Sequence, residues 1–332
     1  MRVVDGVNLS IKEKECVGLL GESGCGKTSL ILAALGFFRI VHRFKQSSIT
    51  EGRLLPFPDQ QVPSEAWEQA VSGQSIYRGE DLLSMDDIKR ARYLGSHISY
   101  IPQGLQGALD PIISIGQQTQ EPLEVHKTGD MRQAEMRTAV LEYLNLVRLA
   151  DADERYVLDP TQFSGGEAQR ILIAMALIGG PYLVIADEPT SALDVTVQRE
   201  VLGVLEMVKD KFDVSLLLVS HDAPVIAEMA DRVAIMYSGK IVEVGDAVKM
   251  FHEPAHPYTQ GLMMSFPRIV MMQMKGGGER LRLRGIPGAP PDLMNLPTGC
   301  RFHPRCKHAI ELCKTREPEY REVERGHWIS CH

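Results

Sequence analysis

The chain contains 332 residues, of which 44% are hydrophobic and 24% charged, a balance that excludes a wholly disordered chain and allows a sizeable core. Its 36 basic and 43 acidic residues give a formal net charge of -7, and no long basic run indicates a polyanion-binding surface. No stretch has the length and apolarity of a membrane-spanning helix, and the N-terminal residues lack a signal-peptide core. We therefore expect a cytosolic chain with one large domain and a smaller appendage.

The first motif joins a predicted strand to a predicted helix. The apolar run VGLL is followed by GESGCGKT, which fits the phosphate-binding pattern G-x-x-x-x-G-K-[ST]. Glycines let the backbone direct its N–H groups at phosphate oxygens, Lys27 supplies a cation and the Thr28 hydroxyl suits Mg²⁺. A chance glycine-rich turn is the alternative. The predicted nucleotide-binding residues are Gly21, Glu22, Ser23, Gly24, Cys25, Gly26, Lys27, Thr28 and Ser29.

Cys25 lies inside this loop, next to a predicted helix N-terminus. A thiolate is stabilised at such a position, so one hypothesis is an unusually reactive cysteine. The alternative is a small, inert residue that fills space.

The middle of the chain alternates between strand and helix patterns. Residues 46–73 are rich in Ser, Pro, Gln and Gly and are expected to form an inserted surface loop. Helical spacing from about 105 to 165 predicts a helical subdomain. The strands YLVIAD at 182–187 and SLLLVS at 215–220 flank an amphipathic helix, which indicates a parallel sheet. A hairpin over 233–245 is expected to end that sheet.

Two acids follow the apolar strand YLVIAD at its carboxyl end. Open α/β sheets collect their ligands at this edge, so Asp187 would hold Mg²⁺ and Glu188 would polarise an attacking water. Taken alone, an apolar strand that ends in two acids is more often a strand that reaches solvent.

Four further motifs remove this ambiguity: IPQ, FSGGEAQR, SALD and VSHD. With the phosphate loop and the acidic strand, they resemble the Q-loop, signature, D-loop and switch histidine of an ABC ATPase, in the order of that family. The resemblance implies an α/β fold with a P-loop NTPase core and an inserted helical subdomain. The matching residues are Gln103, Ser164, Gly165, Gly166, Asp194 and His221.

The resemblance also implies roles for these residues. The Ser164–Gly166 segment would bind the ATP of a second subunit, since a helix N-terminus favours an anion, although Ser164 could also be an ordinary N-cap. His221 would contact the γ-phosphate and stabilise the transition state. Gln103 would sense the nucleotide and contribute to the Mg²⁺ site while its loop touches a permease. Without the resemblance, Gln103 and His221 would be interpreted as ordinary polar residues after strands.

The last part of the chain carries four of the six cysteines, Cys300, Cys306, Cys313 and Cys331, with the spacing C-x5-C-x6-C-x17-C. In a reducing compartment this set suits zinc or an iron–sulfur cluster. The segments HEPAHPY and LPTGCRFHPRC resemble the C-terminal region of oligopeptide and dipeptide (and nickel) importer ATPases. That resemblance implies a [4Fe-4S] cluster, with a structural role.

The resemblance divides the chain into an ABC ATP-binding domain at 1–250 and a transporter C-terminal region at 251–332. Three departures accompany it, one of which is that residues 46–73 exceed the usual length in the family. Family members begin with another strand and an adenine-stacking aromatic residue, so the expectation is either a different start or lost base stacking. Gly104 replaces the acidic residue that follows the Q-loop glutamine, which weakens the expected permease contact.

The resulting hypothesis is an ATPase that drives import of peptides or related small solutes through a membrane permease. Its cofactors would be ATP, Mg²⁺ and the [4Fe-4S] cluster. Its partners would be a second ABC ATPase subunit, identical or similar, two integral membrane permease subunits and, indirectly, an extracytoplasmic solute-binding protein, with no nucleic acid. It would lie peripherally on the cytoplasmic face of the cell membrane. The alternative is a soluble ABC ATPase that acts on nucleic acid or ribosomes.

Overall fold

A computed structural model of the chain describes residues 3–37, 71–104, 107–126, 131–191, 193–266 and 285–332. These residues group into two compact units. The first consists of residues 1–27 with 95–332 and contains the main sheet; the second consists of residues 28–94. Within the described ranges no helix is both long and apolar enough to cross a membrane.

Five short apolar strands form the parallel part of the main sheet. Parallel strands are usually covered on both faces, which explains why nearly all of their residues are buried. The parallel sheet inferred from the alternation of strands and helices is therefore present in the structure. In sheet order the strands are β4 (Ile98–Ile101), β5 (Leu183–Asp187), β6 (Ser215–Ser220), β1 (Cys16–Leu20) and β7 (Arg232–Tyr237).

Three antiparallel strands extend this sheet beyond β7. A tight turn at Ser238 and Gly239, both with positive φ, leads into β8 (Lys240–Asp246), as the hairpin pattern predicts. The expectation that the sheet ends there is wrong. The C-terminal strand β10 (His327–Ser330) pairs with β8, and β9 (Tyr320–Glu324) pairs with β10. Short strands with little apolar character gave no signal of this extension.

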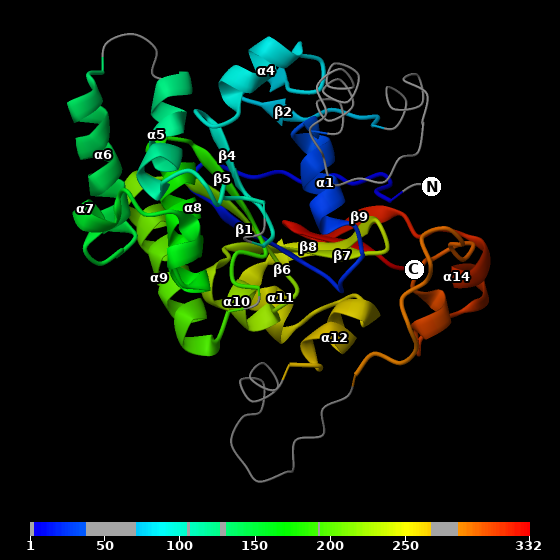
Figure 1. The fold of residues 1–332 in the computed structure, drawn as a ribbon. Coiled ribbons are helices and arrows are strands. Elements are labelled where there is room, and N and C mark those ends of the chain that lie inside the picture. Colours follow the sequence, from blue (N-terminus) through cyan, green and yellow to red (C-terminus); the bar gives the residue numbers. More distant parts are fainter. Residues whose placement is uncertain (1–2, 38–70, 105–106, 127–130, 192, 267–284) are drawn as a thin grey trace. The chain divides into compact units, whose positions relative to one another are not determined.

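Helices occupy the chain between β4 and β5, where α8 packs against α5 and α6 (Figure 1). The helical spacing anticipated over 105–165 is therefore present, although it continues to Ile178. The status of these helices as a separate subdomain stays a prediction. They are α5 (Ile115–His126), α6 (Gln133–Leu146), α7 (Ala152–Arg155), the 3-10 turn η2 (Pro160–Gln162) and α8 (Gly165–Ile178).

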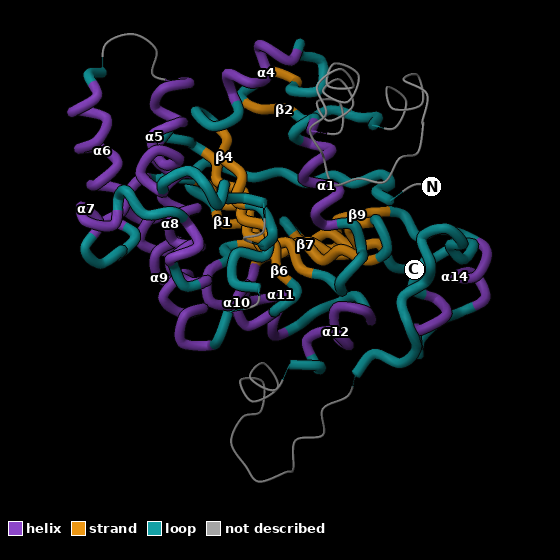
Figure 2. Tube along the Cα trace, viewed as in Figure 1, coloured by secondary structure: helices purple, strands orange, loops and turns teal. Residues whose placement is uncertain are grey.

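The other helices among the described residues of this unit follow β5. Helix α9 buries one apolar face, and α10 and α11 pack against the strands of the sheet, which Figure 2 shows in orange. These helices are α9 (Val195–Phe212), α10 (Ala223–Met229), α11 (Ala247–His252), α12 (Pro257–Met263), the 3-10 turn η3 (His303–Arg305) and α14 (Glu311–Thr315).

The smaller unit, residues 28–94, contains most of α1 (Lys27–Ala34), the two-stranded sheet of β2 (Ile76–Tyr77) and β3 (Glu80–Asp81), and α4 (Asp87–Tyr93). Its central polar group is Arg90, which is fully buried and donates to the carbonyls of Leu82 and Met85. The inserted loop expected at 46–73 lies outside the described residues up to residue 70.

Candidate functional site

The phosphate-binding loop connects β1 to the start of α1. Gly24 and Gly26 have φ values of +77° and +106°, which side chains rarely tolerate. At Gly21 a Cβ atom would lie 2.3 Å from the backbone oxygen of Met236 on β7. The glycines are therefore required for two reasons, backbone conformation at two positions and close packing on the sheet at the third.

Lys27 closes this loop and is 5% exposed. Its ammonium group donates to the backbone oxygens of Gly21 at 2.9 Å and Glu22 at 3.3 Å. It also lies 3.8 Å from a carboxylate oxygen of Glu188. A buried cation is thus held by the loop itself, next to the end of β5.

Glu188 is the first residue after β5 and adopts a left-handed backbone with φ of +48°. This conformation is uncommon for glutamate and occurs preferentially at functional sites. Its N–H donates to Val219 O at 2.8 Å, which fixes the bend to the neighbouring strand. The carboxylate accepts from Gln103 Nε2 at 2.9 Å and lies 3.2 Å from His221 Nδ1. With Lys27, side chains from three other motifs therefore meet at this carboxylate.

Asp187 ends β5 and is fully buried. Its Oδ2 accepts from the hydroxyl of Tyr100 at 3.3 Å. Burial raises the pKa of Tyr100 and the neighbouring charge of Asp187 raises it further, so the hydroxyl keeps its proton. Sequence reasoning missed Tyr100 because a tyrosine on an apolar strand is most often a packing residue.

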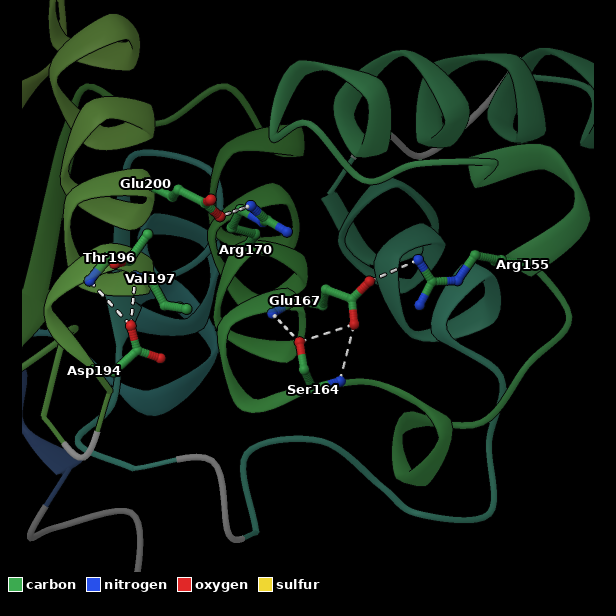
Figure 3. A network of polar contacts seen from close by, with 8 residues as sticks. All are labelled: Arg155, Ser164, Glu167, Arg170, Asp194, Thr196, Val197 and Glu200. Atoms are coloured by element: carbon green, nitrogen blue, oxygen red, sulfur yellow. Dashed lines mark hydrogen bonds and ion pairs between the residues drawn. The ribbon is translucent and has the colours of Figure 1, made fainter.

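The signature segment forms the start of α8 (Figure 3). Ser164 is the N-cap: its hydroxyl accepts from Glu167 N at 3.3 Å, while the Glu167 carboxylate accepts from Ser164 N at 2.9 Å. Arg155 pairs with Glu167 at 2.7 Å, and hydrogen bonding from Arg155 lowers the pKa of Glu167 to about 2. The ordinary N-cap role considered for Ser164 is therefore present, with the helix N-terminus exposed at Ser164 and Gly165.

Asp194 is the N-cap of α9 and is also exposed. Its carboxylate accepts from the N–H groups of Thr196 at 3.0 Å and Val197 at 3.1 Å (Figure 3). The two helix starts pack closely, because a Cβ atom at Gly166 would lie 2.1 Å from Val197 Cγ1. The structure thus brings the predicted signature and D-loop residues together.

Residues 4–191, more than half of the chain, match the family described as ABC transporter. The chain belongs to the ABC transporter family. Residues 242–313 also match the family described as oligopeptide/dipeptide transporter, C-terminal region. The family resemblance identified from the motifs is confirmed.

Full-length relatives agree with this assignment. The probable peptide ABC transporter ATP-binding protein y4tR of Sinorhizobium fredii is 36% identical and aligns with 99% of this chain and 89% of its own length. The dipeptide transport ATP-binding protein DppD of Bacillus subtilis is 38% identical over 100% of this chain and 89% of its own length. The protein of that name from Escherichia coli is 34% identical over 100% of this chain and 90% of its own length.

Solved ABC cassettes share the fold. The dimeric structure of the ATP-binding cassette MJ0796, in a post-hydrolysis state bound to ADP and Pi, superimposes with a TM-score of 0.58 at 23% sequence identity. The match covers 74% of this chain and 90% of that chain. The predicted P-loop ABC ATPase core is therefore confirmed as the fold of this ABC transporter family member.

The structure does not support the hypothesis that Cys25, in the phosphate loop, is unusually reactive. Cys25 is 5% exposed, and burial raises its pKa even though Lys27 acts in the opposite direction. A thiol of raised pKa carries little thiolate at neutral pH. The inert, space-filling alternative is the better interpretation.

The [4Fe-4S] cluster predicted at Cys300, Cys306, Cys313 and Cys331 is not supported, and that prediction is wrong. All four lie within residues 285–332, and across the described parts of the chain no three His, Cys, Asp or Glu side chains form a group that could hold a metal ion. They are free, half-buried thiols, and burial raises the pKa of Cys300 to about 11. Spacing along the sequence does not determine side-chain direction, which is why the pattern misled.

A C-terminal segment this short buries too little apolar surface to be stable on its own. In this ABC transporter family member, β10 pairs with β8, and Phe302 is 4% exposed within the main core. The segment is thus stabilised by joining the larger unit.

Proposed function

We propose that this chain is the ATP-hydrolysing subunit of a membrane importer for peptides or related small solutes. The observation that carries the proposal is the convergence of Lys27, Gln103 and His221 on the carboxylate of Glu188. Phosphoryl transfer to water needs this combination of a phosphate-binding cation, a group that orients water and polar groups beside the reacting phosphate.

The phosphate loop would bind ATP through the backbone N–H groups of its glycine-rich turn and the start of α1. Lys27 would exchange its present carbonyl partners, Gly21 and Glu22, for phosphate oxygens, which are stronger acceptors for a buried cation. Ser29, one residue after Thr28, would add a further polar contact.

Three residues supply oxygen atoms of the kind that Mg²⁺ prefers: Thr28, Gln103 and Asp187. Asp187 is fully buried with a donating Tyr100, and Gln103 directs its amide nitrogen at Glu188, which leaves its carbonyl oxygen for another partner. The oxygen atoms of Gln103 and Asp187 are of the type that suits the ion. Mg²⁺ would neutralise charge on the phosphate oxygens, while Asp187 would hold it through water.

Glu188 would orient and polarise the attacking water, and its bent backbone brings the carboxylate to the end of the sheet. His221 would bridge to the γ-phosphate and stabilise the charge that develops there. Because Lys27 lies 3.8 Å from this carboxylate, water and phosphate would be held by adjacent groups.

A second ABC ATPase subunit, identical or similar, would complete the site. Ser164, Gly165 and Asp194 are exposed at neighbouring helix starts, and the positive end of the α8 dipole favours an anion. The similar cassette MJ0796 is a dimer. The segment Ser164–Gly166 would therefore contact the ATP bound to the phosphate loop of the partner subunit.

The cargo assignment rests on the C-terminal match at residues 242–313 and on relatives named for peptide or dipeptide transport. The chain would act with two integral membrane permease subunits, supplied by an extracytoplasmic solute-binding protein, peripherally at the cytoplasmic face of the membrane. The alternative, an ABC ATPase acting on nucleic acid or ribosomes, is disfavoured by the net charge of -7 and by these relatives.

The test is reconstitution of the chain with its cognate partner ATPase and permease subunits in lipid vesicles. We expect ATP hydrolysis that increases with solute-binding protein and dipeptide, together with dipeptide uptake. If the complete system neither binds nor hydrolyses ATP, the proposed function is refuted. Hydrolysis stimulated by RNA and indifferent to the permease would support the alternative.

A further inference from the structure

Glu22, the second residue of the phosphate loop, is bound on two sides by the C-terminal part of the chain. Its backbone N–H donates to the hydroxyl of Tyr258 on α12 at 3.1 Å. Its carboxylate accepts from both terminal nitrogens of Arg305 on η3, at 2.7 Å and 3.0 Å. Two parallel hydrogen bonds between a guanidinium and a carboxylate form the most directional type of ion pair.

Arg305 is itself rigidly placed and is 7% exposed. Its Nε donates to Pro287 O at 2.9 Å. Its guanidinium carbon lies 5.8 Å from the ring centre of Tyr237, at the end of β7, within range of a cation–π contact. The guanidinium of Arg305 is therefore held at Nε, on one face of its plane and at its terminal nitrogens.

The ring of Tyr258 is held in the same manner. Tyr237, Tyr258 and Phe302 form a buried aromatic cluster, with ring centres 4.6 Å apart for the two tyrosines and 5.2 Å for Tyr237 and Phe302. Their exposed fractions are 1%, 0% and 4%. Since well-packed side chains move little, the cluster gives the two contacts to Glu22 a fixed position relative to β7.

A carboxylate in this loop opposes the loop's function unless it is neutralised. Like charges a few ångströms apart repel strongly where water is partly excluded, and a nucleoside triphosphate is highly anionic. The Arg305 guanidinium offsets the charge of Glu22 and directs its carboxylate toward the C-terminal part. The Glu22 N–H is already bonded to the Tyr258 hydroxyl. The N–H groups that bind phosphate would therefore be those of the residues after Glu22.

We infer that Arg305 is a positioning residue for ATP binding, acting through Glu22, so that the C-terminal part of the chain belongs functionally to the nucleotide site. The inference rests on the proposed function of that site. It predicts a specific dependence: the harm caused by loss of Arg305 comes from the carboxylate that it leaves unpaired, so removal of that carboxylate should reverse it.

The experiment measures MgATP affinity by titration calorimetry for the full-length chain. Arg305→Met should weaken binding by about tenfold, the scale of one lost charge-assisted pair. The double variant Arg305→Met with Glu22→Gln should return to within about threefold of the wild type. The matched control is Arg316→Met, which removes an exposed C-terminal arginine paired with Glu319 and should bind ATP as the wild type does.

Wild-type affinity in a folded Arg305→Met variant overturns the inference, as does a double variant that binds no better than the single one. If Arg305→Met does not fold, Arg305→Gln gives the same decision. A glutamine keeps hydrogen-bond donors without the positive charge, so a loss of affinity that Glu22→Gln reverses is expected, and wild-type affinity overturns the inference. Failure of the wild type itself to bind ATP refutes the proposed function instead.

Discussion

The side-chain amide of Gln103 donates to the carboxylate of Glu188 across 2.9 Å, although the two residues lie 85 positions apart in the sequence. Because β4 pairs directly with β5, the loops that follow these two strands meet at the same edge of the sheet. The pair therefore links the residue proposed to sense nucleotide and permease with the residue proposed to activate water.

Replacement of Glu188 by glutamine should abolish turnover and spare binding. The amide cannot polarise water as a carboxylate does, so we expect steady-state phosphate release to fall by at least about 100-fold. Equilibrium MgATP binding should stay within about threefold of the wild type. Glu206→Gln, an exposed change on α9, is the control. Undiminished hydrolysis in Glu188→Gln would show that Glu188 does not activate the attacking water.

Loss of the Tyr100 hydroxyl should weaken the response to Mg²⁺. The hydroxyl donates to Asp187, and groups that orient a metal-holding carboxylate typically affect metal affinity by about tenfold or more. In Tyr100→Phe the Mg²⁺ concentration for half-maximal hydrolysis should therefore rise by about tenfold. Tyr182→Phe, which alters a half-exposed tyrosine next to β5, should leave the titration unchanged. An unaltered midpoint in Tyr100→Phe would contradict the role of the hydroxyl.

The two roles of Ser164 can be separated by two variants. Ser164→Ala loses the N-cap of α8 and should lower the free energy of unfolding by about 1 kcal/mol. Ser164→Asn keeps an N-cap oxygen and should unfold within about 0.5 kcal/mol of the wild type. Both change the segment Ser164–Gly166 that is proposed to contact ATP of the partner subunit, so both should hydrolyse ATP about tenfold more slowly. Denaturant unfolding and phosphate release measure the two effects, and normal hydrolysis in Ser164→Asn would confine Ser164 to capping.

Protein stability should fall in mild acid because of His256. Burial lowers its pKa from 6.5 to about 4, with the charge of Glu243 acting in the opposite direction. Below pH 6.5 the unfolded chain binds a proton here that the folded chain does not, so stability decreases until about pH 4. The total loss from this group is about 3 kcal/mol.

Denaturant unfolding between pH 7.5 and pH 4.5 measures this loss. In His256→Asn, whose amide oxygen can still accept from Tyr258 N, the pH dependence should become shallower. His308→Asn alters an exposed histidine and should retain the wild-type slope. An identical slope in His256→Asn and the wild type would show that another group governs acid sensitivity.

The motifs of the candidate site can be recognised from the sequence because each is local and strongly constrained. The glycines of the phosphate loop are needed for backbone conformation or close packing, and Asp187 and Glu188 follow a run of apolar residues that is recognisable without a structure. What could not be predicted depends on contacts distant in sequence. The pairing of Trp328 with Val244, the approach of Arg305 to Glu22 and the hydroxyl of Tyr100 beside Asp187 leave no periodic signal.

The same limitation explains the error over the cysteines. Four thiols with suggestive spacing satisfy a pattern, but ligation requires that their sulfur atoms converge, which depends on the path of the backbone between them. That path is set by β9, β10 and the hydrogen bond from Cys300 N to Cys313 O at 2.8 Å.

The pairing of β10 with β8 has a consequence for synthesis of the chain. Strand β8 leaves the ribosome some eighty residues before the strand that covers its free edge, since translation runs from the N-terminus. During that interval a nascent chain presents an unprotected edge to its neighbours, which is the geometry that seeds aggregation. A premature stop codon shortly before residue 327 would make this transient exposure permanent.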